Sequence, residues 1–173
     1  LGLIPGQPQP PQKKFDTLIW DALGRCHREQ PVFVEAESRK VGNVSIPESL
    51  MLAMRASPCL RIETPIDARV QLLMQDYPYF VQDVDFFCAR LETLKDLRGK
   101  EVVERWCQAA QAGHISDVVR QLLLEHYDPG YQQSTQRNYA QFDQATAVPV
   151  QDITPAGLRT VAQALLSGMP QAR

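Results

Sequence analysis

Three consecutive apolar residues, Val32 to Val34, constrain the fold of this chain more than any other stretch. Pro31 precedes them, and the run ends abruptly in polar and charged residues that continue to Gly42. A continuous apolar run is typical of a buried parallel strand, whereas a half-buried strand alternates apolar and polar residues. The pattern therefore predicts a strand over residues 32–36 in an α/β fold. A strand running into a solvated loop fits the same residues equally well.

The polar residues after this run are candidates for a ligand site, because ligands of open α/β sheets bind outside the carboxyl ends of the strands. Glu35 and Glu37 would share one face of an extended strand and could hold a hydrated magnesium ion or orient a nucleophile. Basic side chains recognise phosphate, and arginine does so in a bidentate manner. The expected substrate- or phosphate-binding residues are Glu35, Glu37, Ser38, Arg39, Lys40, Arg55 and Arg69. The alternative is that these charges only solvate the surface.

A second candidate site is the segment from His126 to Tyr139, which is rich in tyrosine and polar residues. Asp128-Pro129-Gly130 predicts a turn after a helix. Aromatic side chains interleaved with Arg, Ser and Asn can stack on nucleobases and hold phosphates. The residues expected to bind nucleic acid are Tyr127, Tyr131, Ser134, Arg137 and Asn138. The alternative is a polar corner between two helices, in which the tyrosines cover the core.

Composition excludes several classes of protein. The net charge of −2 argues against a uniformly basic nucleic-acid binder, and no apolar stretch approaches the ~20 residues that span a bilayer. The four cysteines form no C-x-x-C pair and the three histidines form no ligand pair, so neither zinc nor a redox dithiol is expected. The number and spacing of the cysteines fit a reduced cytoplasmic protein. The sequence holds no G-x-x-x-x-G-K-[ST], G-x-G-x-x-G or G-x-S-x-G motif.

The chain is expected to consist of four segments. They are an extended proline-rich lead-in (1–12), a strand–helix core (13–78), a helical insertion with a Tyr/Arg loop (79–140) and a terminal strand and helix (141–173). Within them, apolar periodicity predicts helices over 12–25, from 47 to about 56, from 66 onward, over most of 79–127 and from 154 to 166. Strands are expected over 59–63 and 147–153. The chain lacks an initiator Met and reads as part of a longer protein.

Four separated segments together resemble a known family, the bacterial tRNA 2-selenouridine synthases, over the C-terminal half of that enzyme. They are Gln7 to Leu23, Pro31 to Leu50, Met54 to Tyr77 and Glu125 to Tyr139. The resemblance implies a transferase that joins a rhodanese-like domain to a P-loop domain. That enzyme replaces the sulfur of wobble 2-thiouridine in tRNA with selenium. Selenophosphate is the selenium donor, and an S-geranylated intermediate is made from geranyl diphosphate.

The resemblance also implies how the residues above would be used. The fold would be α/β, a partial parallel sheet of a P-loop-kinase-like domain with a large helical insertion. The residues after the first strand, with the Tyr131–Ser134–Arg137 segment, would contact the diphosphate or the anticodon region of tRNA. No covalent cofactor, membrane or DNA partner is expected, and Mg²⁺ is a possible co-ligand. The family's catalytic cysteine and Walker A loop have no counterpart here, so catalytic residues stay unknown.

The isolated chain is therefore expected to complete neither geranylation nor selenation. Two other functions fit parts of the sequence. A small-molecule phosphotransferase of nucleotide-kinase type would account for the strand followed by acidic residues and for the start of the helix at Arg69. A non-catalytic tRNA-docking module would bind RNA without any dependence on a diphosphate.

Overall fold

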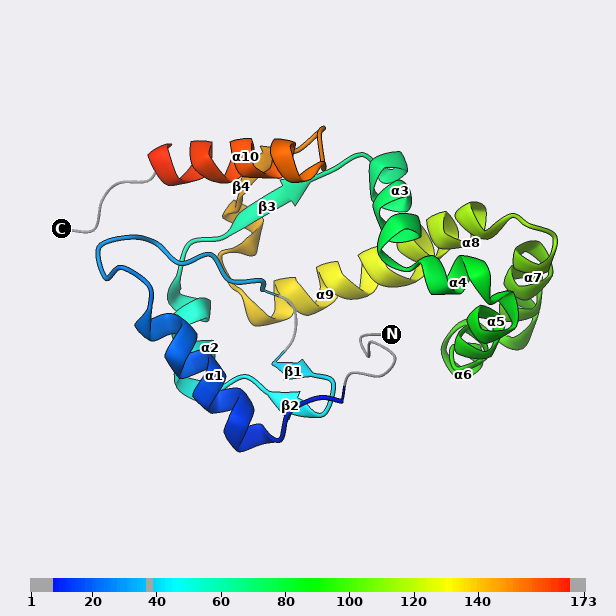
Figure 1. Ribbon diagram of the computed structural model, residues 1–173, viewed down its shortest axis with the longest axis horizontal. Coiled ribbons are helices and arrows are strands. Elements are labelled where there is room, and N and C mark those ends of the chain that lie inside the picture. The colour runs from blue at the N-terminus through cyan, green and yellow to red at the C-terminus, as the bar shows by residue number, and fades with distance from the viewer. Residues whose placement is uncertain (1–7, 37–38, 169–173) are drawn as a thin grey trace. The chain divides into compact units, whose positions relative to one another are not determined.

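The structure is a computed structural model that describes residues 8–36 and 39–168, and within these residues the chain is mostly helical. The helices are α1 (Gln12–Gly24), α2 (Glu48–Ala56), α3 (Ile66–Asp76), α4 (Pro78–Gln82), α5 (Val84–Glu92), α6 (Lys95–Arg98), α7 (Lys100–Gln111), α8 (Ile115–Leu122), α9 (Asp128–Asn138) and α10 (Pro155–Gly168), with a π-helical turn η1 (Leu123–Tyr127) and a 3₁₀ turn η2 (Phe142–Gln144). The strands are β1 (Lys40–Val41), β2 (Val44–Ser45), β3 (Leu60–Glu63) and β4 (Thr146–Pro149). Figure 1 shows their order along the chain.

The chain groups into two compact units. The described residues of Leu1–Arg61, Tyr131–Val148 and Pro155–Arg173 form one, which we call the hairpin unit because it contains β1 and β2. Ile62–Gly130 and Pro149–Thr154 form the other, which we call the helical unit. The four-segment division expected from the sequence stays a prediction.

The hairpin unit begins with an antiparallel pair, β1 and β2, in which Lys40 lies opposite Ser45 and Val41 opposite Val44. Gly42 has a φ of +60° at the first central position of the two-residue turn. This is where a type II′ turn requires glycine, since an L side chain is disfavoured there. A methyl group at Gly42 would also overlap the side-chain amide of Gln9.

Two glutamines attach the proline-rich lead-in to this hairpin. The Gln9 amide donates to the carbonyl of Val41 (3.0 Å) and accepts from the backbone N–H of Asn43 (2.7 Å). The Gln12 amide donates to the carbonyl of Ser45 and accepts from its N–H, both at 2.8 Å. Of the lead-in, the structure describes residues 8–12, and residues 8–11 belong to no helix or strand.

The second sheet pairs β3 with β4. The N–H of Thr146 donates to Cys59 (3.2 Å) and that of Val150 to Glu63 (2.8 Å), so both strands run in the same direction. This small parallel sheet agrees with an α/β fold, in which the expected strand at 59–63 is confirmed. The resemblance to a P-loop kinase in finer detail stays a prediction.

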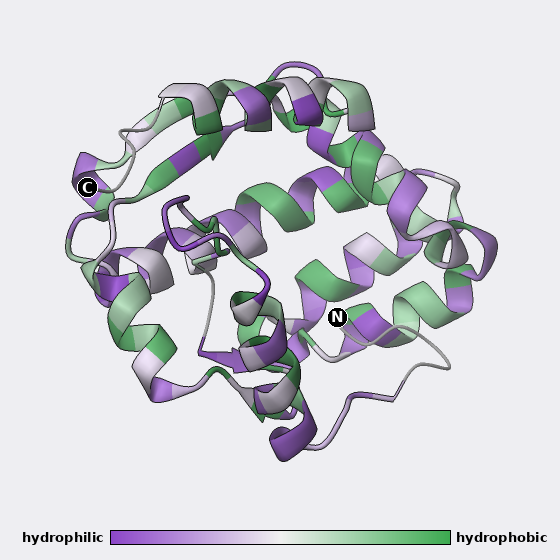
Figure 2. Cartoon of the chain, turned by 60° about the vertical axis from the view of Figure 1, so that its left-hand side comes forward, coloured by the Kyte–Doolittle hydropathy of each residue, from purple (hydrophilic) through white to green (hydrophobic). Residues whose placement is uncertain are grey.

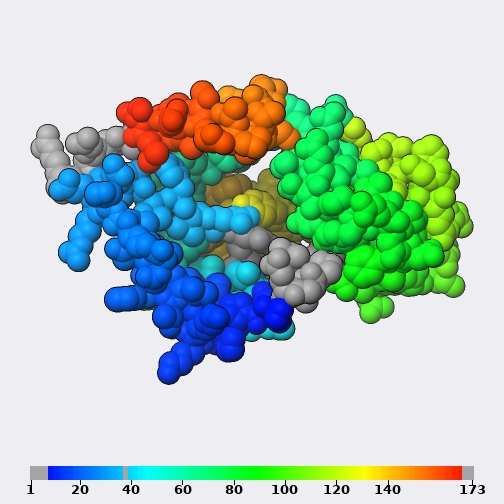
Figure 3. Space-filling model, viewed as in Figure 1, coloured from blue at the N-terminus to red at the C-terminus, as the bar shows by residue number. Residues whose placement is uncertain are grey.

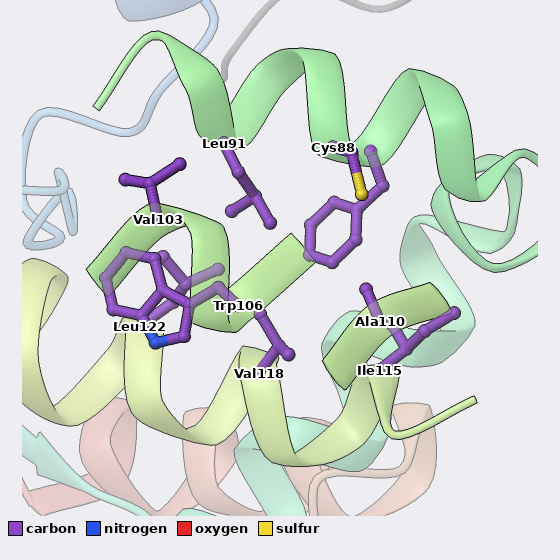
Figure 4. Close-up of a cluster of buried hydrophobic side chains, with 9 residues drawn as sticks. Cys88, Leu91, Val103, Trp106, Ala110, Ile115, Val118 and Leu122 are labelled. Atoms are coloured by element: carbon purple, nitrogen blue, oxygen red, sulfur yellow. The ribbon is translucent and has the colours of Figure 1, made fainter. Parts of the chain in front are cut away.

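The core of the helical unit lies between α5, α7 and α8 (Figures 1 and 4). On α7, Val103, Trp106 and Ala110 recur at helical spacing and are buried. On α8, Ile115, Val118 and Leu122 do the same. Figure 4 shows the Trp106 indole beside Val103, Leu91 and Leu122. The indole N–H donates to the Gln121 side chain at 2.7 Å, so its polar group is satisfied.

Most of the helices expected from the sequence are confirmed, including the almost continuous helical stretch from Tyr79 to Tyr127. Gly113, whose φ is +89°, separates α7 from α8. Figure 2 shows that the helices of the chain carry both apolar and polar residues. None of the helices in the described ranges has both the length and the hydrophobicity of a membrane span. All four cysteines are free thiols.

The strand predicted over residues 32–36 is wrong. Residues 31–36 belong to no helix or strand, and Val32, Phe33 and Val34 are 44–47% exposed. An apolar run forms a buried strand only when neighbouring strands and a covering layer are present. Within the described residues, neither small sheet includes this segment.

The turn predicted at Asp128-Pro129-Gly130, and with it the Tyr/Arg loop, is also wrong, because these residues form the first turn of α9. The π-helical turn η1 precedes them, and the N–H of Asp128 donates to the carbonyl of Leu123, five residues back. Proline inside an α-helix loses an i→i−4 hydrogen bond and meets the carbonyl at i−4. The wider π turn separates those groups, so the chain continues through Pro129 as a helix.

Candidate functional site

Residues from the two predicted binding sets meet in the hairpin unit, at the C-terminal end of α2. The Arg55 guanidinium donates to the Asn138 side-chain oxygen at 3.0 Å. The Asn138 amide in turn donates to the carbonyl of Ser134 (2.8 Å) and lies 3.5 Å from its hydroxyl. Arg55 is exposed, whereas Ser134 and Asn138 are half-buried on α9. The geometry therefore joins one expected phosphate-binding residue to two residues expected to bind tRNA.

The backbone beneath Arg55 is held by Gln141, a residue that sequence reasoning missed. Its side-chain amide donates to the carbonyl of Arg55 at 2.8 Å and also to the carbonyl of Ser57. The Ser57 hydroxyl donates to Ala53 (2.8 Å) and its N–H to Met54 (3.1 Å). The terminal carbonyls of a helix are normally unsatisfied and carry partial negative charge. Here the carbonyls of Ala53, Met54 and Arg55 have donors, which reduces the negative potential beside the positive guanidinium.

Tyr139 and Cys59 are also near this arginine, within the same unit. Tyr139 is 2% exposed, and burial raises the pKa of its phenol, an effect that Cys59 strengthens and the positive charge of Arg55 opposes. Burial likewise raises the pKa of the Cys59 thiol. Both groups are therefore uncharged at neutral pH, and neither cancels the charge of Arg55. For Tyr139, the expected alternative of a tyrosine that covers the core is the one that holds.

Arg69, in the helical unit, has a carboxylate partner. Its guanidinium donates to both carboxylate oxygens of Asp128, at 2.9 and 2.6 Å, which ties α3 to the first turn of α9. This hydrogen bonding raises the pKa of Arg69, an effect that partial burial opposes. Two parallel N–H donors of this kind are also what arginine offers to a phosphate. A phosphate would therefore have to compete with Asp128 for the guanidinium of Arg69.

The other described residues of the expected phosphate set in the hairpin unit lie in the segment that precedes the β1–β2 hairpin and at its start. Arg39 and Lys40 are exposed at the start of the β1–β2 hairpin, where the Arg39 carbonyl accepts from Ile46 at 2.8 Å. Glu35 is exposed in the segment without secondary structure. Glu37 and Ser38 lie outside the described residues. No cluster of three or more His, Cys, Asp or Glu in the described ranges could hold a metal ion.

The two tyrosines expected to bind tRNA are both exposed. Tyr127, at the end of the π turn, and Tyr131, on α9, are 38% and 44% exposed, so both offer ring surface to solvent. Tyr127 also packs edge-on against His126, with the ring centroids 4.9 Å apart. Arg137 is exposed on α9, next to Asn138. Tyr131 and Arg137 thus place an exposed ring and an exposed cation on α9.

His126 is held by Arg98, whose Nε donates to the imidazole Nδ1 (3.1 Å) and whose terminal nitrogen donates to the His126 carbonyl (3.4 Å). Burial, and then the charge of Arg98, lower the pKa of His126. Because Nδ1 accepts a hydrogen bond, the imidazole is neutral with its proton on the other nitrogen. No sequence signal connected these two residues, which are 28 positions apart.

Comparison with known proteins identifies a family for this chain. A family model described as "tRNA 2-selenouridine synthase AAA domain" matches residues 2–98, more than half of the chain. The chain is 25% identical to the tRNA 2-selenouridine synthase of Marinobacter nauticus over 153 residues, which is 72% of this chain and 41% of that protein. It is 24% identical to that of Hydrogenovibrio crunogenus over 163 residues, or 79% of this chain and 44% of that protein.

A shorter match, to the synthase of Pseudomonas aeruginosa, is 38% identical over 72 residues, or 40% of this chain and 20% of that protein. No solved structure matches the chain. The chain spans less than half the length of the first two relatives. The match of the family model nevertheless covers the hairpin, the Arg55 region and the first half of the helical unit. The chain therefore belongs to the tRNA 2-selenouridine synthase family, and its residues 2–98 are the part that matches the AAA domain of that family.

Proposed function

We propose that this chain supplies part of the RNA-binding surface of a cytoplasmic tRNA 2-selenouridine synthase, with Arg55 as its central phosphate contact. The observation that carries the proposal is the hydrogen-bonded group of Arg55, Ser134 and Asn138. It brings residues far apart in the sequence to one exposed cation. The family relation supports tRNA as the substrate of the complete enzyme.

The geometry suits an RNA backbone. Arginine has five N–H donors, and the bond to Asn138 leaves others for a phosphate oxygen. The bond also orients the guanidinium, which lowers the entropy lost on binding. Exposed Arg137 adds a second positive charge on α9, and the exposed ring of Tyr131 adds a surface for base stacking.

In the complete enzyme, wobble 2-thiouridine would be converted to 2-selenouridine through an S-geranylated intermediate. Geranyl diphosphate and selenophosphate would be the co-substrates. The exposed basic residues Arg39 and Lys40 are candidates for the diphosphate, whose leaving charge needs cationic partners. We expect the isolated chain to bind ligands without turnover, since it spans only part of its relatives.

The kinase-type alternative has lost its structural support. It relied first on a strand over residues 32–36 followed by acidic residues, and that strand did not form. It relied second on Arg69, which is paired with Asp128. The docking-module alternative is compatible with the same Arg55 group. It differs from the synthase in one measurable respect, because a docking module binds RNA in the same way with or without geranyl diphosphate.

The test is a fluorescence-anisotropy titration of the full chain with an anticodon stem-loop that carries 2-thiouridine at the wobble position. The titration is run at several salt concentrations, with and without geranyl diphosphate. We expect salt-sensitive binding that the diphosphate strengthens. Arg55→Ala should weaken binding about tenfold at low salt and lower the slope of log affinity against log salt by about one.

Arg105→Ala is the matched control, because Arg105 is exposed on α7 and carries no proposed role. Equal losses for Arg55→Ala and Arg105→Ala would indicate unspecific charge attraction and would refute the proposal. Binding that ignores geranyl diphosphate would favour the docking module. An absence of RNA binding by a chain whose circular dichroism spectrum is that of a folded protein would exclude both.

A further inference from the structure

A contact in the hairpin unit without an assigned role is the one between Gln141 and the end of α2. One side-chain amide donates to two backbone carbonyls, those of Arg55 and Ser57. These residues are 86 and 84 positions from Gln141 in the sequence. The contact therefore joins the segment after α9 directly to the residue that we place at the RNA.

From this geometry we infer that Gln141 is a positioning residue for the anion site at Arg55, an inference that rests on the proposed function. It fixes the backbone from which the Arg55 side chain extends. The Arg55 guanidinium itself is held by a hydrogen bond of 3.0 Å to Asn138, which lies three residues before Gln141. Backbone and guanidinium are thus both held by the same short segment, 138–141.

Gln141 has an electrostatic effect as well. The free carbonyls at a helix C-terminus are the negative end of the helix dipole and repel an approaching phosphate. Gln141 places a donor on the oxygens of Arg55 and Ser57, while Ser57 itself donates to Ala53 and Met54. With these oxygens satisfied, an anion that approaches Arg55 meets less negative potential. Only a neutral donor achieves this without adding charge, and glutamine is such a donor.

The first test measures the position of Arg55 without any ligand. In the full chain labelled with ¹⁵N, the NMR order parameter of the Arg55 Nε–H bond reports how firmly the guanidinium is held. Gln141→Met keeps the side-chain length and removes the donor, so we expect the order parameter to fall. Gln144→Met is the matched control, because Gln144 is an exposed glutamine three residues further along. It should leave the order parameter unchanged.

The second test is a double-mutant cycle in the stem-loop titration. Gln141→Met should weaken RNA binding about threefold, as the loss of a positioning hydrogen bond predicts. In an Arg55→Met background the same substitution should have no further effect, because Gln141 acts through Arg55. Gln141→Asn, whose shorter amide cannot reach both carbonyls, should give a smaller loss and serves if Gln141→Met does not fold.

The outcomes separate this inference from the proposed function. An unchanged order parameter in Gln141→Met, or an equal loss of RNA affinity with and without Arg55, would overturn the positioning role. A lowered order parameter combined with no effect of Arg55→Met on RNA would uphold the positioning of Arg55 and refute RNA binding as its purpose.

Discussion

The helical unit and the hairpin unit differ most in how much apolar surface they bury. The helical unit has a continuous core of nine buried residues between α5, α7 and α8 (Figure 4). In the described part of the hairpin unit, the buried residues are Val44, Met51, Thr135 and Tyr139, and neither α1 nor α10 contains one. The atoms of α10 lie open along the surface in Figure 3.

This contrast follows from the sequence spacing of the contacts. The helical unit is built mainly from one continuous segment, 62–130, so its helices contact their sequence neighbours. The hairpin unit gathers three separated segments and depends on pairings such as that of Arg55 with Asn138, 83 residues apart. Local contacts cost less chain entropy to form than distant ones. The helical unit is thus the part expected to hold its structure independently.

The two tryptophans give the largest test of the contrast, since one lies in each unit. Trp106 is 1% exposed in the helical core and Trp20 is 77% exposed on α1. Trp106→Ala should lower the free energy of unfolding by about 3–5 kcal/mol, because it opens a cavity and removes the partner of Gln121. Trp20→Ala should change it by less than about 0.5 kcal/mol. Urea denaturation followed by circular dichroism measures both, and similar costs would contradict the comparison.

Two glycines with positive φ give the next largest effect. Gly113 (φ +89°) has open space around its Cα, so Gly113→Ala should cost only the backbone strain, about 1–2 kcal/mol. Gly42→Ala adds a clash with the Gln9 amide and should release that side chain. We expect hydrogen exchange at the Asn43 amide to accelerate in Gly42→Ala and not in Gly113→Ala. Unchanged exchange at Asn43 would mean that the Gln9 contact does not hold the hairpin.

The N-terminus of α5 provides a smaller test within the helical unit. The Asp83 side chain accepts from the N–H of Phe86 at 2.8 Å, as an N-cap should. Asp83→Ala should destabilise the unit by about 1 kcal/mol, whereas Asp83→Asn should retain most of the stability. Thermal unfolding of both variants decides this, and equal losses would show that charge rather than capping matters.

The smallest effect concerns pH and His126. Its pKa in the folded chain is lowered, so the unfolded chain binds the proton more tightly. The corresponding stability is complete above the unfolded pKa of about 6.5 and is lost as the pH falls from there through the folded pKa. Unfolding midpoints at pH 7.5 and 5.5 should therefore differ more for the native chain than for His126→Asn. A larger pH dependence in the variant would contradict the lowered pKa.

Sequence patterns correctly predicted those helices whose formation depends on the spacing of apolar residues within the helix itself. The spacing of Val103, Trp106 and Ala110 on one helix and of Val118 and Leu122 on another is set within each helix, and both helices are confirmed. The strand at 32–36 failed because burial of a strand depends on neighbours that a run of three apolar residues does not specify. The β1–β2 hairpin was missed although Gly42-Asn43 between two valines is a recognised hairpin signal.

The sequence predicted which types of residue form the candidate site, but it did not predict which of them contact one another. Arginine, serine and asparagine were recognised as suitable types, but no pattern could show that Arg55 hydrogen-bonds to Asn138 and that Arg69 hydrogen-bonds to Asp128. Gln141 was missed because a single glutamine in a polar segment carries no spacing signal. Distant pairings of this kind become visible only in the fold.

The lead-in is attached through the side chains of Gln9 and Gln12, so substitutions of these side chains should be more harmful here than they are on the exposed face of a β-strand. In a β-strand the backbone makes the hydrogen bonds, so side chains on the exposed face can vary while proline is forbidden. Here the side-chain amides make the bonds, and the prolines around them need no donor of their own. Slow deamidation of either glutamine to glutamate would place a carboxylate against the carbonyl of Val41 or Ser45. In an aged sample, each glutamine that deamidates should therefore add one negative charge and weaken its hydrogen bonds to the hairpin, while the chain keeps its length.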